Sequence, residues 1–100
     1  MSTVALRKIS GPITSLDGTE HLDNIAQHGV YHQAQNVRAT AAQGYPTGLA
    51  GLLEVHNPSS AGMIYQRYTC YHGRGMYYRG YYAYKKTWSP WRRILTEQTP

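Results

Sequence analysis

Hydrophobic and polar positions alternate most regularly in the second half of the chain, where short apolar runs are separated by glycine and polar residues. Two of these runs, Met63–Cys70 and Met76–Tyr82, are rich in aromatic and β-branched residues and flank the glycine-containing residues 71–75. Runs of this composition joined through glycine predict a β-hairpin. A third run over residues 87–95 predicts a further strand.

Alternation along a strand assigns its side chains to two faces. The first hairpin strand places Ile64, Gln66, Tyr68 and Cys70 on one face, which we interpret as the inner one. If Cys70 pairs with Met76, the opposite face carries the following residues: Tyr65, Arg67, Tyr77, Arg79 and Tyr81. Arg67 then faces Arg79, a like-charge pair that requires aromatic rings, water or an anion between the two charges. A slip of one residue would exchange the two faces of one strand.

The first half of the chain predicts fewer elements. Residues 1–19 read as an extended lead-in, and the helical spacing of Leu22, Ile25 and Ala26 predicts one short helix over residues 20–28. Strands are expected at Gly29–Gln33 and Gly51–His56, and the polar residues 34–46 between them predict a surface loop. The predicted fold is mainly β, a small antiparallel sheet over residues 20–95 with one short N-terminal helix as its minor α component, followed by a tail at 96–100.

Composition adds a basic, tyrosine-rich character to this sheet. The chain has 100 residues, a formal net charge of +5, ten tyrosines, two tryptophans and no phenylalanine. Most of the positive charge lies in the second half, which favours attraction to polyanions such as acidic glycans, lipopolysaccharide or nucleic acid. Cys70 is the only cysteine, so no disulfide within the chain is available, and no window predicts a signal peptide or a membrane span.

Several short motifs, in this order and spacing, resemble the pyocin knob domain of bacteriophage and R-type pyocin tail fibres. The motifs are Leu22-Asp23-Asn24-Ile25, Gly29-Val30-Tyr31, Gly44-Tyr45-Pro46, Gly51-Leu52-Leu53-Glu54-Val55, Ile64-Tyr65-Gln66-Arg67-Tyr68-Thr69, Tyr77-Tyr78-Arg79-Gly80-Tyr81-Tyr82 and Trp88-Ser89-Pro90-Trp91-Arg92. The resemblance covers roughly residues 21–95. It implies a homotrimeric virion part that is made in the bacterial host cytoplasm, works with other tail-fibre or baseplate proteins, and contacts the bacterial surface without catalysis.

The basic aromatic face is the candidate site. We expect it to comprise Tyr65, Arg67, Tyr77, Arg79, Tyr81 and Trp91. Flat rings can cover the apolar face of a sugar while arginine pairs with phosphate or carboxylate, which predicts glycan binding. The same side chains could instead pack against a neighbouring subunit. Aromatic rings interleaved with arginine also suit single-stranded nucleic acid, which is the alternative from a different functional class.

Other chemically suggestive residues point away from catalysis and cofactors. His28 and His32 have ligand spacing, but Gly29 should end a helix between them, so no metal is expected within one chain. Cys70 is predicted to be a buried small hydrophobe. The carboxylates are too few for a glycosidase pair in one subunit. Trp88 and Trp91, three residues apart, are expected on opposite faces of a strand that Pro90 confines to an edge or bulge.

Overall fold

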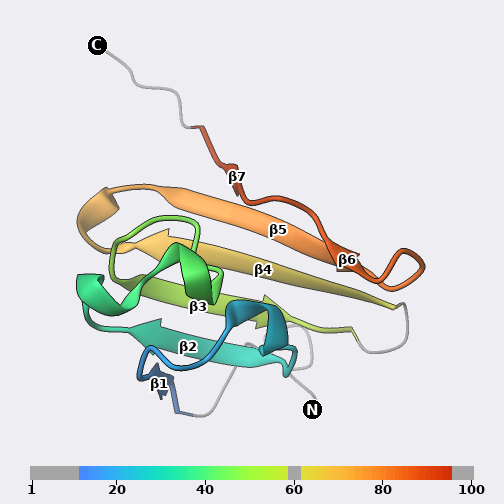
Figure 1. Cartoon of the computed structure of the whole chain (residues 1–100), viewed down its shortest axis with the longest axis horizontal. Coiled ribbons are helices and arrows are strands. Elements are labelled where there is room, and N and C mark those ends of the chain that lie inside the picture. The colour runs from blue at the N-terminus through green and yellow to red at the C-terminus, as the bar shows by residue number, and fades with distance from the viewer. Residues whose placement is uncertain (1–11, 59–61, 96–100) are drawn as a thin grey trace, which may run out of the picture.

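The computed structural model describes residues 12–58 and 62–95, which form one β-sheet with short turns on one of its sides (Figure 1). The strands are β1 (Thr14–Leu16), β2 (Gly29–Gln33), β3 (Gly51–His56), β4 (Met63–Cys70), β5 (Met76–Tyr82), β6 (Thr87–Trp88) and β7 (Arg92–Arg93). They lie in the order β1-β2-β3-β4-β5-β6, and β7 also pairs with β5. All pairs are antiparallel except β1 and β2. The predicted mainly β fold is confirmed.

The four central strands have the bounds that the hydrophobic pattern predicts, but β1 is an addition. Thr14–Leu16 was expected to be part of an extended lead-in, and it pairs in parallel with β2 instead. Its Leu16 is buried in the core. A three-residue strand with one buried side chain is too short to produce a hydrophobic period, so the pattern alone could not reveal it.

The predicted helix over residues 20–28 is wrong, because the segment forms only a 3-10 turn at Leu22–Asn24. His21 Nδ1 accepts a hydrogen bond from the backbone N–H of Asp23 at 3.1 Å, which caps this turn. Gln66 Nε2 then donates to the backbone carbonyls of Leu22 at 2.8 Å and Ile25 at 3.0 Å. A long-range side chain thus satisfies carbonyls that a longer helix would have used internally. No helix in residues 12–58 or 62–95 has the length and apolar character needed to cross a membrane.

The hairpin register differs by one residue from the predicted one. Thr69, and not Cys70, pairs with Met76. The connection is longer than expected because Cys70 N–H donates to the carbonyl of Gly75 at 2.8 Å, closing a loop that contains the 3-10 turn Tyr71–Gly73. Gly75 has a φ of 139°, a conformation that L side chains rarely adopt. The slip turns Tyr77, Arg79 and Tyr81 to the opposite face from Tyr65 and Arg67.

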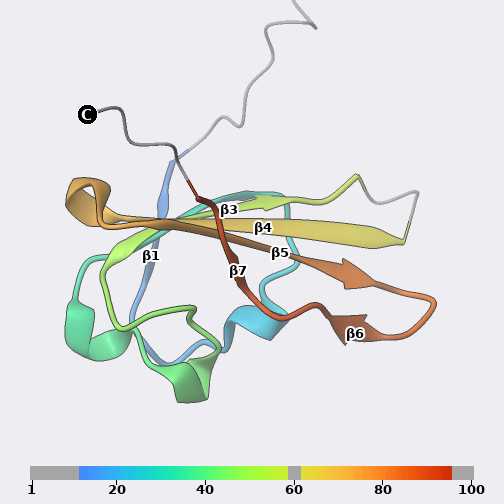
Figure 2. The same ribbon diagram turned by 90° about the horizontal axis from the view of Figure 1, so that it is seen from above.

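The two sides of the sheet are unequal. Figure 2 shows the three turns before β3 on one side, at Leu22–Asn24, Asn36–Arg38 and Ala41–Gln43, while no other described element covers the far side of β3, β4 and β5. The covered side holds the core, in which Leu22, Leu53, Val55 and Tyr68 are completely buried. We call the far side the open face.

The loop over residues 34–46 was predicted to lie on the surface with little to bury, and this is wrong in part. Ala39 and Tyr45 are buried in the core. The Tyr45 ring meets the Tyr68 ring edge-on, with 5.6 Å between centroids. The buried amide of Gln33 donates to the Tyr45 hydroxyl at 3.2 Å. The loop therefore packs over the core, and an aromatic pair and a buried hydrogen bond hold it there.

Candidate functional site

The structure divides the six predicted site residues between the two sides of the sheet. Tyr65 and Arg67 lie on the open face and are about half exposed, at 48% and 47%. The other four lie on the covered side: Tyr77, Arg79, Tyr81 and Trp91. The predicted pair of facing arginines does not form, because Arg67 pairs with Tyr78 and Arg79 pairs with Gln66. The single basic aromatic face predicted from the sequence is therefore not present.

Arg79 occupies the centre of the covered side, with only 6% of its surface exposed. Its Nε donates to Gln66 Oε1 at 2.9 Å, and its Nη1 lies 2.8 Å from Asp23 Oδ1. Burial lowers the pKa of Arg79, and the hydrogen bond with the Asp23 carboxylate opposes that shift, so the guanidinium keeps its charge. This arrangement joins β4, β5 and the Leu22–Asn24 turn through one side chain.

Two tryptophans enclose the same guanidinium. Its central carbon lies 4.2 Å from the Trp88 ring centroid and 4.5 Å from the Trp91 ring centroid. Such distances give strong cation–π contacts, especially where the cation is shielded from water. The prediction that the two indoles point to opposite faces is wrong, because both reach Arg79.

The chain between the tryptophans explains how both reach the same side. β6 ends at Trp88 and β7 begins at Arg92, so the ladder with β5 is interrupted around Pro90, which agrees with the predicted edge or bulge at this residue. Ser89 bridges the break: its N–H donates to the Gly80 carbonyl at 2.8 Å, and its Oγ accepts from Gly80 N–H at 3.1 Å. The extra residues change the alternation and return Trp91 to the core side.

The indole N–H groups fix both rings to distant loops. Trp88 Nε1 donates to the Asp23 carbonyl at 3.2 Å, and Trp91 Nε1 donates to the Gly44 carbonyl at 2.7 Å. We name the set of Asp23, Gln66, Arg79, Trp88 and Trp91 the Arg79 cluster. Within it, Arg79 Nη2 is the one buried side-chain donor that has no hydrogen-bond partner among the described residues.

The Arg79 cluster draws on the sequence motifs that resemble the tail-fibre domain. Asp23, Gln66 and Arg79 come from three of them, and the Trp-Ser-Pro-Trp motif supplies both indoles. Gly44, which accepts the Trp91 hydrogen bond, belongs to a further motif. Residues up to 68 positions apart in the chain therefore meet around the buried Arg79 guanidinium, and the spacing of the motifs alone did not reveal these contacts.

The open face carries a second group of polar and aromatic side chains. Arg67 Nη2 lies 2.9 Å from Glu54 Oε1, and His56 Nε2 lies 3.3 Å from the same oxygen. Tyr65 and Tyr78 flank this group, and each is 48% exposed. The face therefore offers aromatic surface around a charge pair that is already neutralised.

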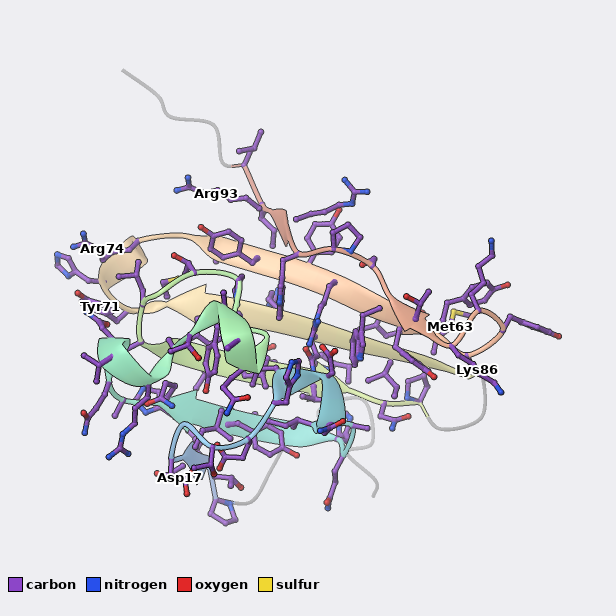
Figure 3. The ribbon with its side chains drawn as sticks, viewed as in Figure 1. Asp17, Met63, Tyr71, Arg74, Lys86 and Arg93 are labelled. Atoms are coloured by element: carbon purple, nitrogen blue, oxygen red, sulfur yellow. The ribbon has the colours of Figure 1, made fainter. Side chains whose placement is uncertain are left out.

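Positive charge gathers along the β5–β7 edge of the sheet. Figure 3 shows Arg74, Arg93 and Lys86 spread along this edge, whereas Asp17 lies at the opposite, β1 side. We call this row the basic edge, and it comprises Arg74, Lys85, Lys86, Arg92 and Arg93. None of these five cations pairs with an acidic side chain in the part of the chain that the structure describes. An edge of this kind attracts polyanions at low ionic strength.

Cys70 is buried, as predicted, and burial raises the pKa of its thiol. A thiol of this kind is a poor nucleophile. Within residues 12–58 and 62–95, no group of three or more His, Cys, Asp or Glu side chains could hold a metal ion.

Comparison with known proteins connects this architecture to tail fibres. No family model matches the chain. The probable tail fiber protein of Escherichia phage T1 is 40% identical over 58 residues, which cover 52% of this chain and 8% of that protein.

Solved structures extend the match over most of the chain. The N-truncated R2-type pyocin tail fiber aligns with a TM-score of 0.72 and 35% identity, over 86% of this chain and 35% of that one. The R1 pyocin fiber of P. aeruginosa aligns with a TM-score of 0.75 and 30% identity, over 90% of this chain and 23% of that one. The chain thus spans a minor part of each fibre that it matches. The predicted resemblance to phage and R-type pyocin tail fibres is confirmed.

Proposed function

We propose that the chain is a structural and adhesive module of a phage or pyocin-like tail fibre, placed in the tail of the particle and without catalytic activity. The observation that carries this proposal is the agreement of fold with R-type pyocin fibres at 30% to 35% identity over 86% to 90% of this chain. In this role the module contributes to fibre assembly and to recognition of polysaccharide on the host surface. Other tail-fibre or baseplate proteins are its partners in the particle.

We further propose that three copies assemble into a homotrimer through the open face. Its exposed rings, Tyr65, Tyr78 and Tyr82, supply the amphipathic surface that subunit interfaces favour. The Arg67–Glu54 pair is neutral as a unit, so bringing copies together does not create an unpaired charge. Assembly through this face would leave the basic edge accessible to the host surface.

Light scattering coupled to size-exclusion chromatography tests the assembly directly. At micromolar concentration we expect three times the 11.3 kDa mass of one chain, unchanged between low and high salt and after nuclease treatment. Tyr78→Glu should shift the mass toward that of one chain. Val37→Glu introduces the same charge on the covered side, at a residue that is 80% exposed, and should leave the mass unchanged. A wild-type monomer would contradict the trimer, and unchanged adsorption of fibres carrying both Arg92→Ala and Arg93→Ala would remove this part of the basic edge from host contact.

The basic edge supports a second candidate, a polyanion-binding domain for single-stranded nucleic acid. Five cations without acidic partners among the described residues lie along one side, and Tyr71 stacks near Arg74 with 5.7 Å between the guanidinium carbon and the ring centroid. Nucleic-acid binding would appear as a complex that forms at low salt and dissociates at high salt. Retention of nucleic acid by the chain in the chromatography above would favour this candidate, and its absence would favour the fibre module.

A further inference from the structure

A surface hollow of about 460 Å³ lies beside the Arg79 cluster, between the Leu22–Asn24 turn and the strands β5 and β6. Its lining consists of Asp23, Asn24, Ala26, Ile64, Tyr81 and Trp88. The volume falls in the range of small-molecule sites, which combine an apolar wall with a few placed polar groups. Aromatic groups come from the strands and polar groups from the turn, so the hollow has both kinds of wall.

The aromatic wall is held in place before any ligand arrives. Arg79 covers one face of the Trp88 indole, and the indole N–H is bound to the Asp23 carbonyl. The Tyr81 ring lies 5.4 Å from the Trp88 ring, at an interplanar angle of 58°. Trp88 and Tyr81 both line the hollow, so this pair of rings forms its aromatic wall. A fixed wall of this kind lowers the entropic cost of binding.

The polar wall offers hydrogen-bonding groups that the fold does not use. Asp23 Oδ1 is held by Arg79, and its side chain remains 45% exposed. Neither Asp23 Oδ2 nor the side-chain amide of Asn24 has a hydrogen-bond partner in the described residues. A carboxylate oxygen beside an amide can accept and donate hydrogen bonds to adjacent hydroxyl groups.

We propose that this hollow binds one neutral pyranose residue of a surface polysaccharide. A pyranose ring presents C–H bonds on its flat side, which suit the Tyr81 and Trp88 rings, and hydroxyls at its rim, which suit Asp23 and Asn24. The free Asp23 Oδ2 can only accept hydrogen bonds, so it disfavours an anionic group, which also only accepts, at this position. The inference deepens the proposed host-surface role and rests on it, but it assigns recognition to the covered side and not to Tyr65 and Arg67.

The two tryptophans provide a built-in readout. Each tryptophan gives one indole N–H signal in a proton–nitrogen correlation spectrum of the full chain. Trp88 lines the hollow, whereas Trp91 does not line it and donates its indole N–H to the Gly44 carbonyl. We would titrate the methyl pyranosides of glucose, mannose, galactose and N-acetylglucosamine, with glucuronic acid and glucose 6-phosphate as anionic probes. We expect at least one neutral pyranoside to shift the Trp88 signal in a saturable manner while the Trp91 signal stays fixed.

Two variants test the assignment of the walls. Asn24→Ala should weaken the neutral pyranoside roughly three- to tenfold, the effect of one lost hydrogen bond, without moving the Trp91 signal. Tyr81→Ala should weaken it further by removing one ring. Tyr84→Ala, a tyrosine that is 89% exposed and outside the hollow, is the matched control and should bind as the wild type does.

Three results would overturn the proposal: no neutral pyranoside shifts Trp88, only the anionic sugars do, or Asn24→Ala and Tyr81→Ala both bind like the wild type. Light scattering on the same samples separates this failure from that of the fibre module. A trimer with no response at Trp88 would remove the hollow and leave the fibre assignment standing. A saturable Trp88 shift in a monomer would support the hollow and count against the assembly.

Discussion

Arg67 and Arg79 belong to neighbouring strands and each pairs with one carboxylate, yet their surroundings differ. Arg67 is 47% exposed beside Glu54, so water competes for both charges. Arg79 is 6% exposed, lies between two indoles and also donates to the buried amide of Gln66. Water solvates Arg67 at little cost if its partner is lost, but cannot do the same for the groups around Arg79.

Arg79→Ala should therefore lower the free energy of unfolding by about 3 kcal/mol, because it leaves Gln66 without its donor and removes the guanidinium between the indoles. Arg67→Ala, its matched control, should change the same quantity by about 0.5 kcal/mol. Urea denaturation followed by tryptophan fluorescence measures both. Equal losses in the two variants would contradict a structural role for the Arg79 cluster.

Cys70 allows a simpler test of burial at the same scale. The thiol is 2% exposed and burial raises its pKa, so the folded chain holds it protonated and out of reach. We expect iodoacetamide to label Cys70 at neutral pH only at urea concentrations that unfold the chain. Rapid labelling without urea, with the far-ultraviolet circular dichroism unchanged, would contradict the buried position.

Among the elements, the hairpin shows why the bounds of strands can be predicted from the sequence while the face on which each side chain of β5 lies cannot. Aromatic and β-branched composition located β4 and β5 correctly. The register depended on the loop, where His72 has a φ of 56° and Gly75 a φ of 139°. Several loop conformations suit the residues 71–75, and a change of one residue exchanges a whole face. The prediction therefore placed Arg79 on the wrong side of the sheet.

The alternation of β4 correctly placed Ile64, Gln66, Tyr68 and Cys70 on the inner face, but it could not show their partners, because the contacts of the covered side join distant segments. Tyr45 packs on Tyr68, and Gln66 satisfies the carbonyls of Leu22 and Ile25. Local periodicity carries no information about such pairs, so it could place Gln66 on the inner face without showing which distant groups its amide meets. The order of the family motifs, by contrast, pointed to the correct architecture, because those motifs supply the Arg79 cluster.

The close packing between β3 and β4 can be tested at Gly51 of β3, with Gly80 of β5 as the comparison. A Cβ added at Gly51 would lie 2.5 Å from the Thr69 carbonyl oxygen and 2.9 Å from the Tyr68 ring, whereas one added at Gly80 would meet nothing nearer than the Ile64 carbonyl oxygen at 3.6 Å. Gly51→Ala should destabilise the fold by about 2 to 3 kcal/mol through overpacking, and Gly80→Ala by less than about 0.5 kcal/mol. Thermal unfolding of the two variants measures the difference, and similar midpoints would contradict the close approach.

At the scale of the whole molecule, tyrosine takes the place of phenylalanine in the core, and this makes the stability of the fold decrease at alkaline pH. Burial raises the pKa of Tyr31, Tyr45 and Tyr68 above the usual value of 10.0, most strongly for Tyr68. The folded chain therefore keeps these protons at a pH at which the unfolded chain releases them. Their contribution is complete below about pH 10 and is lost as the pH rises further.

We expect the free energy of unfolding to be flat from neutral pH to about pH 9 and then to fall, with each fully protected tyrosine adding about 1.4 kcal/mol per pH unit to the slope. Tyr68→Phe should lower the free energy of unfolding by about 1 kcal/mol at neutral pH, since the Tyr68 hydroxyl donates to the Leu49 carbonyl at 2.6 Å. Above pH 10, the free energy of unfolding of this variant should fall less steeply than that of the wild type. Tyr84→Phe, at an exposed position, should follow the wild-type curve. If the free energies of unfolding of the wild type and of Tyr68→Phe fell in parallel above pH 10, Tyr68 would not hold its proton in the folded chain. That result would argue against the buried Tyr45–Tyr68 pair, which fixes the loop over the core.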